Sequence, residues 1–251
     1  MGKFIKGLAR FLRYFVRPIF PVKIYGPRKY EIKKTLFVGN HVSGWDPVLF
    51  YAWTQTHVSF MYKAEFRKSA FLRKALDDLE CVPVNRGEVD LNATHLSLRL
   101  LKSNKPLAVF PEGKRNPDVE HLLPLKTGAA LFAIKTKAPL RAFYVWDRAR
   151  AFRKNYYMVG EEFDLSQFYD QPVTKEVLNE ATGIIRAEME KLRVQLDGIL
   201  AAKGKKRRKR TRKELKKIKA FRESQRESEE STPDEQAVTA AAASADEGLM
   251  Q

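Results

Sequence analysis

The sequence contains a single cysteine, Cys81, in 251 residues. One cysteine cannot form a disulfide within the chain, so the sequence does not require an oxidising compartment and is compatible with a reducing cytosol. Cys81 stands where a short apolar run begins, with no reactive partner close to it in the sequence. We therefore expect a thiol that packs in the interior, not a nucleophile.

Metal-binding and nucleotide-binding motifs are also missing. The spacings by which proteins usually hold a metal ion are not seen around the four histidines, which are His41, His57, His95 and His121. No glycine-rich motif of the kind that cradles a dinucleotide or a nucleoside triphosphate occurs. The sequence thus predicts neither a metal site nor a resident cofactor.

No run of about 18 uncharged apolar residues occurs, so we expect no membrane-spanning helix. Residues 1–19 instead predict an amphipathic helix that ends at Pro18. One side of its helical wheel is apolar, with Phe4, Ile5, Leu8, Phe11, Leu12, Phe15 and Val16, and the opposite side is basic, with Lys3, Lys6, Arg10, Arg13 and Arg17. A helix packed on the domain gives a similar pattern, but phenylalanines opposite cations favour a helix lying in a membrane interface.

The formal net charge of +17 is concentrated at two places in the chain. Residues 1–34 carry 10 basic and one acidic residue, and residues 203–219 carry 12 basic and one acidic residue. Residues 203–251 are first basic and then acidic, and we predict a disordered tail. Its basic part could bind anionic lipid or a nucleic acid backbone, or stay solvated. The scarcity of aromatic residues within it and the N-terminal pattern favour lipid over nucleic acid.

Residues 20–202 have the alternation of elements that is typical of an α/β domain. Apolar runs predict strands near residues 35–39, 58–62, 81–85, 107–110, 139–145 and 156–160. Helical patterns fall near residues 47–54, 66–78, 90–103 and 127–136, and a long helix is expected over residues 174–202. Helices between most strands predict a largely parallel mixed sheet flanked by helices. Loops that follow the strands would then meet at one edge of the sheet.

The most informative segment covers residues 40–47, between a predicted strand and a predicted helix. His41 is followed five residues later by Asp46, and the Asp46–Pro47 pair is typical of a helix N-terminus. A histidine with an orienting carboxylate can act as a general base. The same spacing also arises when the aspartate is only a helix cap and the histidine only a loop residue, so the pair needs support from other segments.

Further segments supply that support. Residues 82–86 form an apolar strand that closes on Arg86, and residues 107–115 form a strand that opens into a charged loop with Glu112, Gly113 and Arg115. In this order and spacing, the segments resemble the glycerolipid acyltransferase family, whose best-known members are the 1-acylglycerol-3-phosphate acyltransferases. The resemblance covers residues 20–170. It includes the family's NHxxxxD block, its FPEGxR block and a lysine at Lys63.

Three positions depart from the family pattern. Asn116 stands where a serine is often found after the third block, and Lys114 replaces a threonine. The fourth block usually holds two prolines, whereas here Ala142 takes the second place after Pro139. These departures concern acceptor or acyl-chain preference more than the reaction itself.

The resemblance implies transfer of a fatty acyl group from an acyl thioester to the hydroxyl of a lysophospholipid, with 1-acylglycerol-3-phosphate giving phosphatidic acid as the favoured case. His41 would be the general base and Asp46 would orient it, while donors near Glu112 and Gly113 would stabilise the oxyanion. For the acceptor phosphate, we predict contacts with Arg86, Lys63 and Arg115.

The expected donor is acyl-CoA or an acyl carrier protein thioester, and the expected location is peripheral, at the cytoplasmic face of the cell membrane. Glycerol 3-phosphate or another lysolipid remains an alternative acceptor. A non-catalytic basic adaptor for membranes or nucleic acid is the alternative outside enzymes, but it has no need of the His41, Asp46, Arg86 and Glu112 set.

Overall fold

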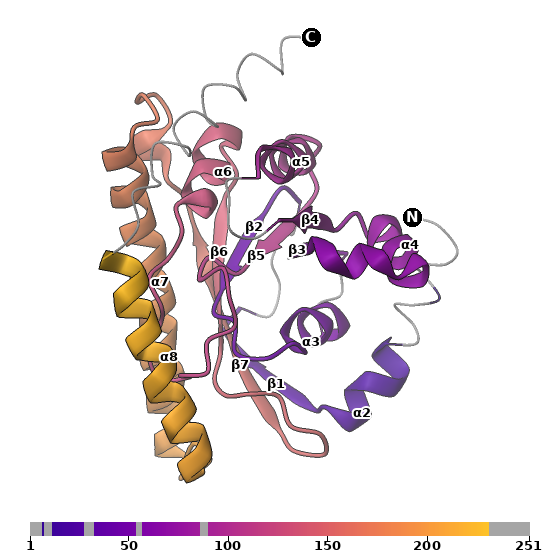
Figure 1. Cartoon of the computed structure of the whole chain (residues 1–251), viewed down its shortest axis with the longest axis vertical. Coiled ribbons are helices and arrows are strands. Elements are labelled where there is room, and N and C mark those ends of the chain that lie inside the picture. Colours follow the sequence, from indigo (N-terminus) through magenta and orange to yellow (C-terminus); the bar gives the residue numbers. More distant parts are fainter. Residues whose placement is uncertain (1–6, 8–11, 28–32, 54–56, 86–89, 231–251) are drawn as a thin grey trace.

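The structure is a computed structural model of the chain, and it describes residues 7, 12–27, 33–53, 57–85 and 90–230. Its centre is a seven-stranded sheet (Figure 1). Across the sheet the strands follow the order β1 (Val22–Tyr25), β7 (Asn155–Phe163), β6 (Leu140–Val145), β2 (Leu36–Gly39), β5 (Leu107–Val109), β3 (Ser59–Lys63) and β4 (Val82–Val84). All the strands from β6 to β4 run parallel.

The sheet becomes mixed at one side because β7 pairs antiparallel with β6, and β1 runs parallel to β7. In the register of the central strands, Leu36 lies opposite both Leu107 and Leu140. All three are fully buried. Uninterrupted burial on both faces is expected of parallel strands that helices cover on each side. The predicted fold class is therefore confirmed.

Helices cover both faces of the sheet (Figure 1). One face carries the short helices η1 (Leu12–Val16) and α2 (Arg17–Ile19), then α3 (Asp46–Trp53) and α4 (Ala70–Asp78), which a 3₁₀ turn η2 (Ala64–Lys68) precedes. The other face carries α5 (Leu91–Lys102), α6 (Gly128–Thr136) and α7 (Lys175–Ala202). A short 3₁₀ turn η3 (Ser166–Phe168) leads into α7, and the last helix is α8 (Arg212–Glu230).

Two hydrophobic clusters correspond to these two faces. The larger one joins α5, α6 and α7 to the sheet, with fully buried Leu101, Ala133 and Ile185. The smaller one lies under α2 and α3 and is rich in aromatic rings, including Phe37, Phe50 and Phe143. Both clusters lie next to the central strands, so the strand ends are held rigidly from both sides.

Most predicted elements lie within a residue or two of the observed ones, but β1 was missed. Its burial is uneven, since Val22 is buried whereas Lys23 and Ile24 are exposed. A four-residue strand with a lysine on it carries little local signal. Its position depends on β7, more than 130 residues further along the chain, with Val22 opposite Asn155.

Most of the predicted N-terminal amphipathic helix lies outside the described residues. In the described part, residues 12–16 form a π-helical turn and Arg17–Ile19 a short α-helix. Pro18 lies in the first turn of this helix, where its missing N–H costs no hydrogen bond, and the helix ends one residue later, at Ile19. Arg17 donates from Nε to the Ala52 carbonyl over 2.9 Å, which ties this segment to α3.

Within the predicted disordered tail, which starts at residue 203, residues 212–230 form a helix. This helix is α8, and two arginines of the basic segment before it bind carboxylates of the domain. Arg207 lies 2.7 Å from Asp197 and Arg210 lies 2.6 Å from Asp147. Opposite charges far apart in the sequence thus order a segment whose composition alone indicates disorder. No helix within the described ranges is long and apolar enough to span a membrane.

The interior stripe of α7 can be tested by truncating one side chain. Ile185 is fully buried against the sheet, so Ile185→Ala should lower the free energy of unfolding by about 2–5 kcal/mol. Val194, on the same helix, is 59% exposed, and Val194→Ala should change it by no more than about 0.5 kcal/mol. Urea unfolding followed by circular dichroism measures both. Equal effects would mean that α7 is not anchored by this stripe.

Candidate active site

The candidate site lies at the edge of the sheet where parallel strands end. His41 follows the end of β2, the segment 110–115 follows β5, and Lys63 is the last residue of β3. Because these strands run in the same direction, their carboxyl ends meet at one edge, where ligands of open α/β sheets usually bind. The topology therefore brings together segments that are up to 70 residues apart in the sequence.

His41 and Asp46 form the predicted pair. Nδ1 of His41 lies 2.9 Å from Oδ2 of Asp46. Since Nδ1 is held by the carboxylate, Nε2 is the ring nitrogen that can take a proton from a substrate. The imidazole also stacks on the Phe110 ring, with 4.3 Å between centroids and 20° between planes. The histidine side chain is 13% exposed and the Asp46 side chain is fully buried.

Asp46 is not the helix cap that its position before Pro47 suggested. Its side chain points back into the turn, where Oδ2 accepts from the Val42 amide over 2.8 Å and from the Ser43 amide over 2.7 Å. Burial raises the pKa of Asp46, and the hydrogen bonds from His41, Ser43 and Val42 act in the opposite direction. The three donors fix the carboxylate and, through it, the orientation of the imidazole.

Glu112 holds the backbone of this turn. Oε1 accepts from the His41 amide over 3.0 Å, and Oε2 accepts from the Leu123 amide over 3.0 Å and from Nδ2 of Asn116 over 2.8 Å. Only 2% of the residue is exposed, and burial raises the pKa of its carboxyl. Protein donors contact both oxygens, and the predicted contact of Glu112 with a substrate stays a prediction. Glu112 is a positioning residue for the His41 loop.

The predicted oxyanion donors also need correction at Gly113. Its N–H donates to the Phe110 carbonyl over 2.9 Å, so it is not free for a substrate. The backbone is left-handed here, with φ of +69°, and a Cβ at this position would lie 2.9 Å from Cε of Lys126. The left-handed backbone favours glycine here, whereas the flexible end of the Lys126 side chain could move aside. Lys126 places a positive charge on this loop, which the sequence interpretation did not assign.

The predicted cations are only partly placed by the structure. Arg115 is exposed, and its Nη1 lies 3.5 Å from the position that a Cβ on Gly44 would take, directly over the His41–Asp46 turn. Lys63 lies at the same edge of the sheet and pairs with Glu65 over 2.6 Å, with both side chains largely exposed. Arg86 lies outside the described residues. Within the described ranges, no group of three His, Cys, Asp or Glu side chains could hold a metal ion.

A profile of the acyltransferase family matches residues 21–146, half of the chain. The chain belongs to the acyltransferase family. It is 27% identical over 119 residues to the 1-acyl-sn-glycerol-3-phosphate acyltransferase of Helicobacter pylori, which covers 47% of this chain and 50% of that protein. The enzyme of the same name from Bacillus subtilis is 26% identical over 183 residues, covering 70% of this chain and 90% of the relative.

The fold has a solved counterpart. The crystal structure of the 1-acyl-sn-glycerophosphate acyltransferase from Thermotoga maritima matches with a TM-score of 0.57 at 22% sequence identity. The match covers 75% of this chain and 79% of that one. At this identity the likeness concerns the fold, and it confirms the acyltransferase architecture of the sheet and its helices.

Two asparagines complete the site of this acyltransferase family member, and the sequence interpretation assigned neither. Asn40 accepts from the Val145 amide over 2.7 Å and donates to its carbonyl over 2.9 Å, which fastens the residue before His41 to β6. The backbone N–H of Asn116 donates to the His41 carbonyl over 2.6 Å. Both are buried. The available signal was position alone, since Asn40 directly precedes His41 and Asn116 directly follows Arg115.

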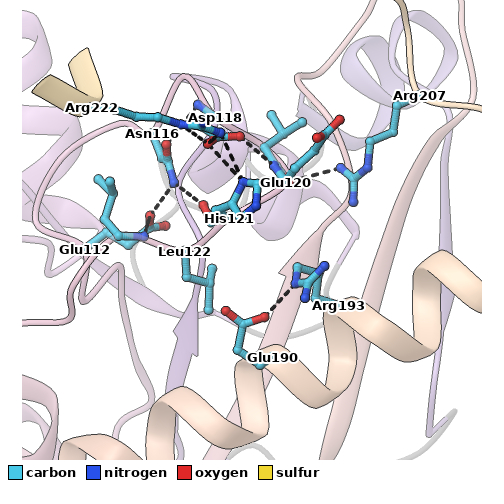
Figure 2. A network of polar contacts seen from close by, with 12 residues as sticks. Glu112, Asn116, Asp118, Glu120, His121, Leu122, Glu190, Arg193, Arg207 and Arg222 are labelled. Carbon is cyan, nitrogen blue, oxygen red and sulfur yellow. Dashed lines mark hydrogen bonds and ion pairs between the residues drawn. The ribbon is translucent and has the colours of Figure 1, made fainter. Parts of the chain in front are cut away.

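The network around Glu112 continues to helix α8 (Figure 2). Oδ1 of Asn116 accepts from the Asp118 amide over 2.9 Å, and Asp118 binds Nε of Arg222 over 2.8 Å. Nδ1 of His121 lies 3.1 Å from Oδ2 of the same aspartate. Burial by itself would raise the pKa of Asp118, but the bonds from Arg222 and from the Glu120 amide outweigh it, and the pKa is lowered. The tail helix is thus connected to the loop that holds His41.

The role of Glu112 can be tested with an isosteric change. Glu112→Gln places an amide group where only acceptors fit, and at least one buried N–H loses its partner. We expect a loss of about 1–3 kcal/mol in the free energy of unfolding, measured by urea denaturation. Glu161, which is exposed on β7, supplies the matched control, and Glu161→Gln should be neutral. A fully stable Glu112→Gln variant would contradict the positioning role.

Proposed function

We propose that this family member transfers a fatty acyl group from an acyl thioester to the free hydroxyl of a lysophospholipid, with 1-acylglycerol-3-phosphate as the acceptor and phosphatidic acid as the product. The observation that carries the proposal is the His41–Asp46 pair, held by Glu112 and Asn116 at the carboxyl edge of the sheet. The names of the relatives from H. pylori and B. subtilis support the choice of acceptor.

The reaction needs a nucleophilic oxygen at neutral pH. Nε2 of His41 removes the proton of the acceptor hydroxyl as its oxygen attacks the thioester carbonyl, and the Asp46 carboxylate stabilises the imidazolium that forms. The carbonyl oxygen of the tetrahedral intermediate becomes negative, and Arg115 and Lys126 supply positive charge on the adjoining loop. The C–S bond then breaks, and the leaving thiolate takes the proton from His41. No acyl-enzyme is required.

The acceptor phosphate requires cations at the same edge of the sheet. Arg115 over the histidine turn and Lys63 at the end of β3 both lie there and both are exposed enough to meet a ligand. Arg86, which follows β4, is the third cation by its place in the sequence. An arginine can bind two phosphate oxygens at once, and lysine cannot.

We also propose peripheral attachment of the chain to an anionic membrane. Tyr14 and Phe15 are 77% and 54% exposed in the described part of the N-terminal segment, and many of its cations precede them in the sequence. A lipid acceptor then reaches the site without leaving the bilayer. Attachment at the cytoplasmic face, and the choice between acyl-CoA and acyl carrier protein as donor, stay predictions.

The mechanism is tested by removing the base. In purified protein supplied with radiolabelled acyl-CoA and 1-acylglycerol-3-phosphate, His41→Ala should lower turnover by about 10²–10⁴-fold. His95 on α5 supplies the matched control, and His95→Ala should keep near-normal turnover. If His41→Ala remained active with an unchanged circular dichroism spectrum, the proposed base would be wrong. A panel that adds glycerol 3-phosphate, other lysolipids and an acyl carrier protein donor identifies the acceptor and the donor.

The phosphate contact is tested by a change that keeps the charge. Arg86→Lys should raise the KM for the phosphorylated acceptor by about 10–100-fold, which corresponds to losing one charge-assisted bidentate contact of about 1.5–3 kcal/mol. The KM for the acyl donor should change little. Steady-state kinetics with each substrate varied in turn separates the two constants. Unchanged acceptor kinetics would remove Arg86 from the site.

A further inference from the structure

The segment formed by η2 and α4 exposes large apolar side chains next to the candidate site. Phe66 is 54% exposed, Phe71 is 70% exposed and Leu72 is 43% exposed. All seven residues from 68 to 74 are exposed, whereas a helix that packs along its whole length buries a residue in each turn. Helix α4 is attached to the domain mainly through its C-terminal part, where Ala75 is its one buried residue.

Cations surround these apolar side chains. Lys68, Arg73 and Lys74 are exposed, and within the described part of the chain no ion pair is formed by any of the three. Arg67, in contrast, is held by Asp77 at 2.6 Å. The exposed face therefore combines apolar groups with positive charges that form no ion pair among the described residues. We call Phe66, Lys68, Phe71, Leu72, Arg73 and Lys74 the α4 surface.

This combination matches an anionic lipid bilayer. Aromatic and aliphatic side chains enter the boundary between head groups and acyl chains, while lysine and arginine bind the lipid phosphates above it. A protein partner would instead have to supply acidic groups around an apolar pocket. Helix α4 lies on the same side of the sheet as η1 and α2, opposite α7 and α8 (Figure 1).

The α4 surface is also continuous with the candidate site, because η2 begins at Ala64, directly after Lys63. We propose that the α4 surface inserts into an anionic membrane beside the entrance to the site, as a second contact independent of residues 1–19. The binding itself does not rest on the proposed function. Its use does: a lysophospholipid would move from the bilayer past α4 to Lys63 and His41 with its acyl chain still in lipid.

The test is binding of the full chain to vesicles of phosphatidylcholine with and without phosphatidylglycerol, measured by flotation. Phe71→Ser together with Leu72→Ser should weaken binding to anionic vesicles at least tenfold. Arg73→Gln and Lys74→Gln should each weaken it about fivefold at low salt, and this loss should shrink at high salt. Val194→Ser on α7, equally exposed but on the opposite side, is the control and should bind normally.

Unchanged binding by the Phe71 and Leu72 double variant, with unchanged circular dichroism, would overturn the proposal. So would a dimer, seen by light scattering, that the double variant separates, because the surface would then join two copies of the chain. Vesicle binding needs no substrate. A chain that binds through α4 but transfers no acyl group would therefore refute the proposed function and leave this inference standing.

A separate observation concerns Asp46 and Tyr157. Oδ1 of Asp46 and the hydroxyl of Tyr157 are both buried, and neither has a hydrogen-bond partner among the described residues. The strand register places Tyr157 opposite Val145, whose backbone is held by Asn40, the neighbour of His41. Tyr157 also belongs to the aromatic cluster that includes Val42 and Leu49, on either side of Asp46. The two polar groups without a partner therefore lie in the same part of the interior, beside the His41–Asp46 turn.

We infer that the Tyr157 hydroxyl donates to Oδ1 of Asp46 in the working enzyme, directly or through one buried water. A donor at Oδ1 would complement the three donors at Oδ2 and complete the fixation of the carboxylate that holds His41. The Asp46 charge acts on Tyr157, since burial and, after it, this carboxylate raise the pKa of the phenol. Tyr157 would thus be a positioning residue and would not touch the substrate.

Tyr157→Phe removes only the hydroxyl. We expect kcat to fall by about 3–10-fold with both KM values unchanged, and the proton NMR signal of Nδ1–H in His41 to shift. Tyr156→Phe, one residue away, is the control for both readouts. An unchanged His41 signal and unchanged kcat would overturn the inference, whether or not the protein becomes more stable, because the hydroxyl would then be only an unsatisfied buried group. The NMR readout does not depend on knowing the acceptor.

Discussion

The site depends on one buried carboxylate, that of Glu112. Glu112 ties the amide of His41, which follows β2, to the amide of Leu123 and the side chain of Asn116, which lie beyond β5. Without it, two loops from neighbouring strands would each have to satisfy buried N–H groups alone. A charged acceptor with two oxygens and about four lone-pair directions can satisfy three donors at once, and no neutral side chain can do the same.

The parts of the structure that follow from local chemistry were predictable. Apolar runs that alternate with helical patterns predicted six of the strands, and the parallel direction of the central ones followed from the helices between them. The His41 and Asp46 pair was also predictable, because five residues within one turn determine their separation. Its stabilisation by the Val42 and Ser43 amides, in place of a helix cap, depends on how the turn closes, and spacing alone does not specify that.

The rest depends on partners far away in the sequence. Glu112 was placed among substrate contacts because its sequence position cannot show that the His41 amide, 71 residues earlier, occupies one of its oxygens. Helix α8 was missed for a related reason. A run of lysines and arginines indicates a solvated tail unless carboxylates of the domain bind it. Asp118, Asp147 and Asp197 come close to the tail arginines only after folding.

The docking of α8 changes the meaning of the net charge. Three arginines of the tail form ion pairs with three carboxylates of the domain, so part of the positive charge is neutralised within the chain. A cation–π contact also links α8 to the domain, with Nζ of Lys114 lying 5.7 Å from the centroid of the Phe221 ring. Trimming the chain at residue 202 to obtain a neat globular unit would therefore uncover a cluster of acidic side chains beside the catalytic loops. The truncated domain would carry three negative charges without their cations, and one of them, Asp118, is bonded to Asn116 in the loop that holds His41.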